Sequence, residues 1–447
     1  MPIPPLAGVT TYARAAKPGF SVEEDVKRFQ RYAWIEKRMM DIGLFWLAPT
    51  PEWEVKEALA LHLSLAAEHA AAIRKRVSEM RNPAPRMDVS PDEALDRFFE
   101  EVLSAQDTLE KLVALYGVLR PALLKAYRAH LEQCNPILDN PTRHMLRHIL
   151  LDDEETAAWG DAAVTAITGD ADKERALAWA AHLQAYLQAA GGVSGTEPVP
   201  ATVPGSRVAG AFEPDFFPRR DKRFARRWTF VNPQRQVSLD ESVPLEERSL
   251  ALMCRRILEM DVPEYLARVI ALAQDEPWDY YVDMTRQLWD EARHAMMGTA
   301  YFEKRGIAWK DLIAIHPGMS IRLATLAPLD AHTVLFAIEQ NLMPAKSGKK
   351  LEYEISRSAG DPLAAIIQDF DWADEVLHVH TGRRWLLARL NLSSQEAVKR
   401  GLQLRASTVH VLDAYTDRGE QVNWWPQFVH HALGHDTAQR EFDLTRQ

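Results

Sequence analysis

Two five-residue stretches decide the fold class expected for this chain: Asp-Glu-Ala-Arg-His at residues 290–294 and Asp-Glu-Val-Leu-His at residues 374–378. Of the 15 histidines, only His294 and His378 have a glutamate three residues earlier, namely Glu291 and Glu375. Residues three apart lie on one face of an α-helix, so each pair directs a carboxylate and an imidazole to the same point. A single Glu-x-x-His pair is weak evidence. Two pairs, each preceded by an aspartate, indicate a shared metal site.

The sequence around these stretches is rich in Ala, Leu, Glu, Arg and Met, which is typical of long helices. Helical segments are predicted at 21–48, 52–81, 91–133, 141–165 and 171–190, and again at 245–272, 276–305, 328–358 and 361–390. Residues 191–244 are rich in Gly, Pro, Ser and Val, which predicts an irregular connector. We therefore expect an all-α chain with a helical bundle at 1–190, the connector at 191–244, a second bundle at 245–392 and a tail at 393–447.

The two helical blocks align with each other at a nearly constant offset. It is 223 between Glu36 and Glu259, 225 between His69 and His294, 223 between Tyr116 and Glu339, and 221 between Glu154 and Glu375. Such regularity favours tandem duplication over a chance register between helical blocks. The first copy has lost half of the pattern, because Ala66, Tyr116 and Ala157 stand opposite Glu291, Glu339 and His378. We expect it to hold no dinuclear site and to have a structural role.

A dinuclear site in a four-helix bundle needs one more glutamate from each of the two remaining helices. Glu259 lies 32 residues before Glu291, and Glu339 lies 36 residues before Glu375. Each interval suits a helix, a turn and half of the next helix. Glu339 interrupts an apolar stretch, which is costly unless its carboxylate is paired or bound to a metal. Glu264 is the alternative to Glu259, because Pro263 leaves the helical phase open.

The predicted ligand set therefore has four carboxylates and two imidazoles: Glu259, Glu291, His294, Glu339, Glu375 and His378. This oxygen-rich set suits iron or manganese and disfavours zinc or copper(I) sites that prefer thiolates. Four carboxylates also balance the charge of two divalent ions. Asp290 and Asp374 are expected to accept a hydrogen bond from a metal-bound imidazole, each from the histidine of the other motif. Solvated positions on the helix surface are the alternative for these two aspartates.

With these motifs the chain resembles the ferritin-like di-iron carboxylate superfamily over residues 245–390. The Asp-Glu-x-Arg-His form is most similar to the oxygen-activating branch, such as the bacterial multicomponent monooxygenases. The resemblance implies two tandem ferritin-like four-helix bundles, the first degenerate. It also implies a dinuclear iron centre in the second bundle, with manganese or a mixed pair as alternatives, and dioxygen as co-substrate. Glu291 and Glu375 are then expected to bridge or flank the metals, and Glu259 and Glu339 to be terminal ligands.

The expected function is that of a dioxygen-dependent oxidoreductase that hydroxylates, N-oxygenates or desaturates a small organic substrate. An external electron donor is expected, because the sequence has no flavin, nicotinamide or iron–sulfur motif. Candidates for pocket walls, or for plain core, are Tyr265, Trp289, Phe336 and Trp372. The alternatives are a ferroxidase or iron-handling protein, a di-manganese protein with catalase-like activity, and a scaffold in which the second site is also inactive.

The composition narrows the range of partners. The 447 residues carry a net charge of −10, which disfavours nucleic acid and acidic membranes. The basic cluster at 219–227 is interpreted as a strap over acidic helices in preference to an RNA contact.

Two cysteines cannot form a disulfide framework. No signal peptide or membrane-length apolar run is visible, so a cytoplasmic protein is expected, and the sequence allows an oligomer.

Overall fold

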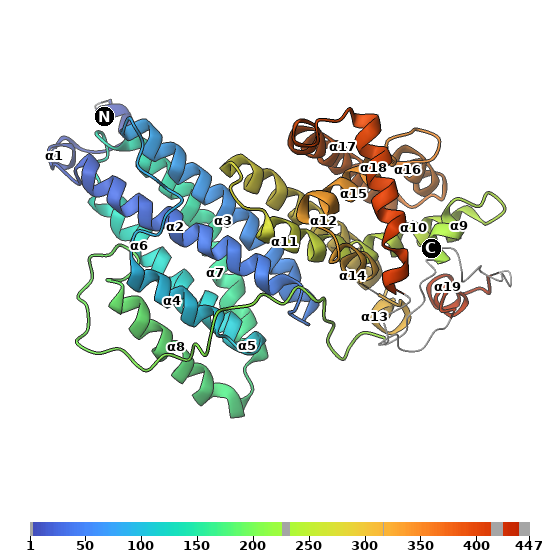
Figure 1. Ribbon diagram of the computed structural model, residues 1–447, viewed down its shortest axis with the longest axis horizontal. Coiled ribbons are helices and arrows are strands. Elements are labelled where there is room, and N and C mark those ends of the chain that lie inside the picture. Colours follow the sequence, from blue (N-terminus) through green and yellow to red (C-terminus); the bar gives the residue numbers. More distant parts are fainter. Residues whose placement is uncertain (1–2, 226–232, 316, 413–422, 438–447) are drawn as a thin grey trace. The chain divides into compact units, whose positions relative to one another are not determined.

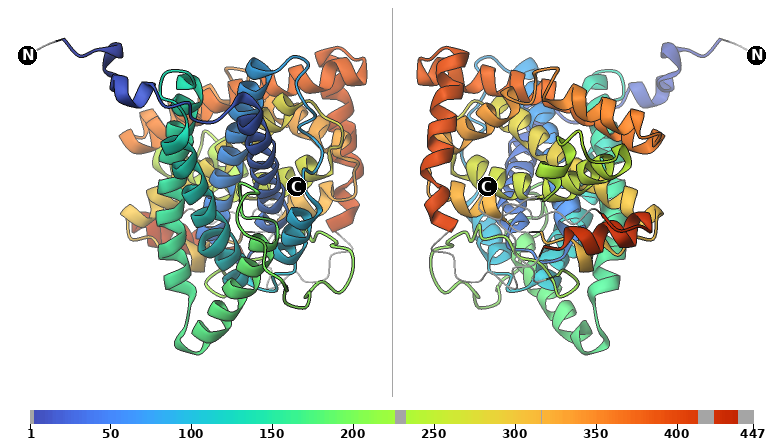
Figure 2. Two further views of the ribbon diagram at one scale, coloured as in Figure 1. Left: turned by 90° about the vertical axis from the view of Figure 1, so that its left-hand side faces the viewer. Right: turned by 90° about the vertical axis from the view of Figure 1, so that its right-hand side faces the viewer.

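The computed structural model describes residues 3–225, 233–315, 317–412 and 423–437, and within these ranges every regular element is a helix (Figure 1). Figure 2 shows the same elements from two sides, again as helices joined by loops. The all-α prediction is thus confirmed for the described residues. None of their helices combines the length and the apolarity required to span a bilayer.

The chain divides into two compact units. Unit 1 consists of Met1–Gly43 and His62–Pro214, and unit 2 consists of Leu44–Leu61 and Asp215–Gln447. This division differs from the predicted boundaries at 190 and 244, because unit 1 extends to Pro214 and the hairpin at 44–61 belongs to unit 2. The hairpin joins unit 2 because Trp53 packs against Phe224 and Trp309 there.

Unit 1 is built on long helices that closely follow the predicted segments. Its elements are α1 (Tyr12–Ala15), α2 (Val22–Leu47, to Gly43), α3 (Trp53–Met80, from His62), α4 (Glu93–Leu103), α5 (Thr108–Leu112), α6 (Arg120–Gln133), α7 (Asn140–Ile167) and α8 (Lys173–Ala189). The single segment predicted at 91–133 is divided, because Asp92 and Asp107 each cap a new helix with their side chains. Between α5 and α6 the chain is π-helical at Val113–Leu119.

Unit 2 contains the elements that carry both sequence motifs. They are α9 (Pro233–Ser238), α10 (Leu245–Leu258), α11 (Asp261–Leu272), α12 (Trp278–Lys304), α13 (Trp309–Leu312), α14 (Gly318–Leu323), α15 (Pro328–Gln340), α16 (Lys349–Ser358), α17 (Pro362–Leu390), α18 (Ser394–Ser407) and α19 (Trp425–Leu433). Within the described residues, the part of the chain predicted as a tail thus contains α18 and α19, and the predicted connector contains α9.

Four helical arms pack around the centre of unit 2. The first arm is α10 with α11, the second is α12, the third is α15 with α16, and the fourth is α17. The first arm contacts the second and the third, and the fourth contacts the same two. Each arm therefore has two neighbours, and side chains from all four can meet in the middle.

Two of the segments predicted as single helices are interrupted, and each interruption has a local cause. The helix predicted at 245–272 breaks at Glu259–Met260, because Pro263 has no N–H to donate to the carbonyl four residues earlier, that of Glu259. The segment at 328–358 breaks at 341–348, which contains Pro344. The first break places Glu259 at the end of α10 instead of inside a helix.

The two unbroken arms hold the sequence motifs rigidly. Helix α17 begins at the side-chain cap of Asp361, which accepts hydrogen bonds from the backbone of Leu363 at 3.1 Å and Ala364 at 3.0 Å. It ends at Asn391, which is left-handed. Helix α12 lies so close to α10 that a Cβ on Gly298 would lie 2.9 Å from the backbone nitrogen of Ile257. This contact fixes the end of α10, where Glu259 lies.

Candidate metal centre

The six predicted ligands converge in the centre of unit 2. They fall into two groups of donors, and within each group the donor atoms lie within 4.8 Å of one another. The first group is Glu259, His294, Asp371 and Glu375, and the second is Glu291, Glu339 and His378. All four arms contribute, and six of the seven residues are buried while Glu259 is partly buried. The structure thus adds one donor, Asp371, which the sequence analysis missed although it lies one helical turn before Glu375.

Glu291 lies between the two histidines. Its Oε2 is 3.3 Å from Nδ1 of His294, and its Oε1 is 3.5 Å from Nδ1 of His378. Glu375 is also shared between the groups, since it belongs to the first and its Oε2 is 3.7 Å from Nδ1 of His378. The two imidazole rings are 6.0 Å apart. Glu291 and Glu375 therefore occupy the positions from which one carboxylate can contact two ions.

The outer nitrogens of the histidines face Asp374 and Asp290. Nε2 of His294 is 3.2 Å from Oδ2 of Asp374, and Nε2 of His378 is 3.6 Å from Oδ2 of Asp290. Each aspartate thus lies beside the histidine of the other motif. An Nε2–H that points to a carboxylate leaves the Nδ1 lone pair directed at the glutamates, which is the tautomer that a metal ligand requires.

Two buried cations that sequence reasoning missed also lie in the cluster. Nζ of Lys349 is 2.7 Å from Asp371 and 2.9 Å from Glu375. Arg256 is paired with Asp371, and its Nη2 is 2.7 Å from Glu259. These two side chains neutralise part of the negative charge of the first group. In contrast, no Lys or Arg of the described residues lies within 4 Å of the carboxylates of Glu291 and Glu339.

Burial and contacts with neighbouring charges raise the pKa of some carboxyls in the cluster and lower the pKa of others. Burial raises the pKa of Glu339 well above its ordinary value and that of Glu259 to about 7. Burial acts on Glu291 too, but hydrogen bonds with both histidines outweigh it and hold its pKa at about 2. Burial alone would lower the pKa of His294, whereas Asp371 and Asp374 raise it to about 10. A metal ion entering this cluster would therefore displace protons.

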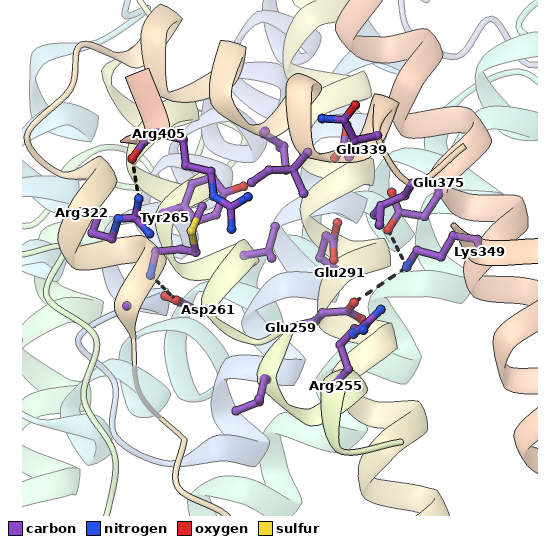
Figure 3. A pocket seen from close by; sticks show the side chains of 18 of the residues that line it. Arg255, Glu259, Asp261, Tyr265, Glu291, Arg322, Glu339, Lys349, Glu375 and Arg405 are labelled. Carbon is purple, nitrogen blue, oxygen red and sulfur yellow. Dashed lines mark hydrogen bonds and ion pairs between the residues drawn. The ribbon is translucent and has the colours of Figure 1, made fainter. Parts of the chain in front are cut away.

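The cluster opens into a cavity of about 520 Å³, shown in Figure 3. Four predicted ligands line it at one end: Glu259, Glu291, Glu339 and Glu375. Of the four aromatic residues proposed as pocket walls, only Tyr265 lines the cavity. Phe336 instead packs in a core cluster with Val379 and Leu386. This volume lies in the range that small organic ligands occupy.

Glu264, the alternative first-arm ligand, lies outside the cluster. Its carboxylate accepts hydrogen bonds from Arg220 at 2.5 and 2.8 Å and is 2.7 Å from Nζ of Lys56. These two cations lower the pKa of Glu264 in spite of its burial. The break at Glu259 rotates the following helix, so Glu259 joins the donors and Glu264 faces the strap.

The strap interpretation is supported for the part of the basic cluster that lies in the described residues. Arg219 is 2.7 Å from Asp215, Arg220 binds Glu264, and Arg223 contacts Glu54 at 2.6 Å. Phe224 packs on Trp53. Arg226 and Arg227 lie outside the described residues.

A smaller cluster of one histidine and several carboxylates lies inside unit 1. Nδ1 of His69 is 3.6 Å from Glu36, its Nε2 is 3.1 Å from Asp152, and Tyr127 donates to Glu36 at 2.7 Å. The third carboxylate is that of Asp153, which is paired with the buried Arg120. The carboxylate of α7 that is grouped with Glu36 and His69 is therefore that of Asp153 and not that of Glu154, which the sequence alignment pairs with Glu375. Glu154 is half exposed and paired with Arg128, because it lies on the outer face of α7.

Unit 1 also holds a group of donors that the sequence analysis did not consider. It consists of Asp25, His130 and Asp139, all buried. Nε2 of His130 is 3.0 Å from Asp25, and Arg76 donates to Asp139 at 2.8 Å. These residues come from distant parts of the sequence and follow no helical spacing, so no local pattern pointed to them.

Comparisons of the chain with protein-family models, with curated proteins and with solved structures found no match. In its described residues the chain is all-helical, with a buried cluster of carboxylates and imidazoles that opens into a cavity.

Proposed function

We propose that unit 2 is a dinuclear metalloenzyme of the di-iron carboxylate type, which uses dioxygen to oxidise a small organic substrate. The observation that carries the proposal is the convergence of five carboxylates and two imidazoles from four helical arms at the end of a cavity. Iron is the metal that this donor set suits, with manganese or a mixed pair as alternatives. Hydroxylation, N-oxygenation and desaturation remain the candidate reactions.

The donor set fits two divalent ions. The five carboxylates of the cluster, less the charges of Arg256 and Lys349, leave three negative charges to balance the four positive charges of such a pair. Several buried atoms that face the cluster have no hydrogen-bond partner: Oε2 of Glu259, Oε2 of Glu375 and Nδ1 of His378. Buried polar atoms rarely lack a hydrogen-bond partner, so these unpartnered atoms support the presence of a bound metal ion in the centre of the cluster.

When bound, a pair of iron or manganese ions supplies the redox chemistry for reaction with dioxygen. The residues of the chain have separate tasks. Asp374 holds the proton of His294 at Nε2. Asp290 lies 3.6 Å from Nε2 of His378 and places a negative charge beside it, and Glu291 spans the two groups of donors. The four arms exclude water on all sides except the cavity, through which the substrate approaches. An external electron donor is part of the proposal.

We further propose that the two units are tandem ferritin-like bundles that arose by duplication. The support is a set of equivalent contacts at equivalent positions. His69 contacts Glu36 and Asp152, as His294 contacts Glu259 and Asp374. His62 binds Tyr116 at 2.6 Å, as Gln287 binds Glu339 at 2.5 Å. In unit 1, Arg120 pairs with Asp153 and Tyr127 donates to Glu36, although the second oxygen of each carboxylate has no hydrogen-bond partner. Because a buried arginine already pairs with one of these carboxylates, we propose a structural role for that unit.

An organic substrate is favoured over iron handling by the cavity. A ferroxidase or a di-manganese catalase needs access only for ions or small oxygen species. A cavity of about 520 Å³ with apolar walls is larger than that task requires. One observation favours a second candidate, a metal-free polar core in an inactive scaffold: Arg256 and Lys349 already pair with Asp371.

Metal content separates these candidates. Protein produced with supplemented iron and manganese should contain about two metal ions per chain by elemental analysis. The variants Glu291→Ala and His378→Ala should lose them, while Glu154→Ala, on the outer face of α7, should keep them. Wild-type protein that binds no metal would favour the scaffold. Mixing the ferrous protein with dioxygen in a stopped-flow instrument then distinguishes an oxygenase, whose transient absorption decays faster with substrate, from a storage protein that forms mineral.

A further inference from the structure

We propose that the cavity of unit 2 binds an amphipathic carboxylic acid, with its carboxylate held at Arg322, which lines the cavity together with Arg405. This inference deepens the proposed function, on which it depends only for the orientation of the ligand. In Figure 3 the two arginines lie at the opposite side of the cavity from the labelled glutamates. The carboxylate of such a ligand therefore points away from the metal ligands, and its apolar end points toward them.

Arg322 is placed to receive an anion. It projects from α14, and its Nη2 donates to the backbone carbonyl of Arg405 at 2.5 Å while its Nε donates to Thr408 at 3.3 Å. Both acceptors are uncharged, so they orient the guanidinium without neutralising it. Within the described parts of the chain no carboxylate lies within 4 Å of it. Burial and the nearby charge of Arg405 lower the pKa of Arg322, and a bound anion relieves both effects.

The cavity also has many apolar side chains in its lining. They include Val262, Met319, Leu335, Ile338, Leu342 and Leu402. A hydrocarbon chain that covers these side chains is stabilised by about 25 cal/mol for each Å² removed from water. A lining that combines arginines on one side with many apolar side chains matches a ligand that has a charged head group and a hydrocarbon chain.

Tyr265 adds a single polar group to these walls. Its hydroxyl is buried and has no hydrogen-bond partner, although a buried tyrosine hydroxyl normally finds one. Burial and the carboxyls of Glu339 and Glu291 raise its pKa, so it remains a neutral donor.

The choice of a carboxylate over a phosphate follows from Asp261. This buried residue also lines the cavity, and its charge acts on Arg322. Its carboxylate binds the hydroxyl of Ser320 and the backbone of Met319 at 2.6 Å. A doubly charged phosphate beside Asp261 would meet stronger repulsion than a singly charged carboxylate.

The test is ligand binding to metal-free, full-length protein by isothermal titration calorimetry. The probes are octanoate, 1-octanol, octylammonium and octyl phosphate, which share the hydrocarbon chain and differ in the head group. The variant is Arg322→Met. The matched control is Arg268→Met, because Arg268 is a partly buried arginine of α11 that bonds to the backbone of Leu326 and does not line the cavity.

Octanoate should bind to the wild-type protein at least about tenfold more tightly than 1-octanol, and Arg322→Met should lose about tenfold or more of the affinity for octanoate, as expected for charge-assisted hydrogen bonds. The control should keep the wild-type affinity. Equal affinity for octanoate and 1-octanol in the wild-type protein would overturn the proposal without any variant. Tighter binding of octyl phosphate than of octanoate would overturn the choice of a carboxylate. The titration is done without metal and so does not depend on metal binding. If the protein bound octanoate but proved unable to bind metal, this site would stand while the proposed function failed.

Discussion

Replacement of Lys349 tests whether the cluster is a metal site or a set of ion pairs. Lys349 is buried, with its ammonium between Asp371 and Glu375. In the metal-free protein its charge holds these carboxylates together. In the metal-bound protein the same charge would compete with the ions for the same oxygens. The variant Lys349→Met keeps most of the apolar length of the side chain and removes the ammonium group.

Lys349→Met should destabilise the metal-free protein but strengthen its binding of metal. Removal of one partner from a buried ion pair destabilises a protein by about 3–5 kcal/mol. At 2–4 °C for each kcal/mol, the metal-free variant should melt roughly 6–20 °C below wild type. Two unit charges 4 Å apart interact by about 4 kcal/mol at an effective dielectric of 20, so loss of the ammonium should raise metal affinity by about tenfold or more.

The assay is thermal unfolding by circular dichroism, with and without added iron(II) or manganese(II), together with a metal titration. Lys56→Met is the matched control, since Lys56 is also fully buried and lies 2.7 Å from Glu264. Glu264 keeps Arg220 as a partner, just as Asp371 keeps Arg256. The control should lower the melting temperature without changing metal affinity. Metal binding that is unchanged or weaker in Lys349→Met would refute the reasoning.

Three further predictions concern other parts of the structure. Asp374→Asn should weaken metal binding by about 10–100-fold, because Asp374 orients His294, and an unchanged titration would contradict this role. Gly298→Ala should lower the stability of unit 2 by about 1–3 kcal/mol and reduce its metal content, because the added methyl would displace the end of α10. Denaturant unfolding measures the loss, and Gly117→Ala, whose methyl meets only ordinary contacts, is the control. The pKa of His69 stands at about 10, because its carboxylate partners outweigh burial. The stabilising effect of the charged imidazole should be complete below about pH 6.5 and lost as the pH rises through about 10. Between these values the free energy of unfolding should fall by up to about 1.4 kcal/mol per pH unit, and His69→Gln should remove this pH dependence.

Local spacing accounts for what the sequence analysis anticipated. The helices follow from composition and periodicity, and α12 and α17 lie within a few residues of their predicted bounds. The pairs Glu291–His294 and Glu375–His378 each share a helix face, and a three-residue spacing is sufficient to establish that. The position of each outer aspartate beside the histidine of the other motif was also expected, and the structure places both there.

The errors arose where helices break or where the register between helices matters. Pro263 ends α10 at Glu259, and this break decides between Glu259 and Glu264 as the donor of the first arm. Asp153 was mistaken for Glu154 because a shift of one residue turns a side chain through about 100° on a helix. Asp371 was overlooked because a carboxylate one turn from a motif is common on exposed helix faces as well.

The sequence by itself determined the all-α class and the four glutamates and two histidines that can share a site, because these properties depend on spacing within one helix or on the order of helices. Only the tertiary structure decided that Asp371, Arg256 and Lys349 join them and that a cavity with two arginines lies beside them. Those residues meet through the packing of separate arms, and the distances that packing creates leave no periodic trace in the chain.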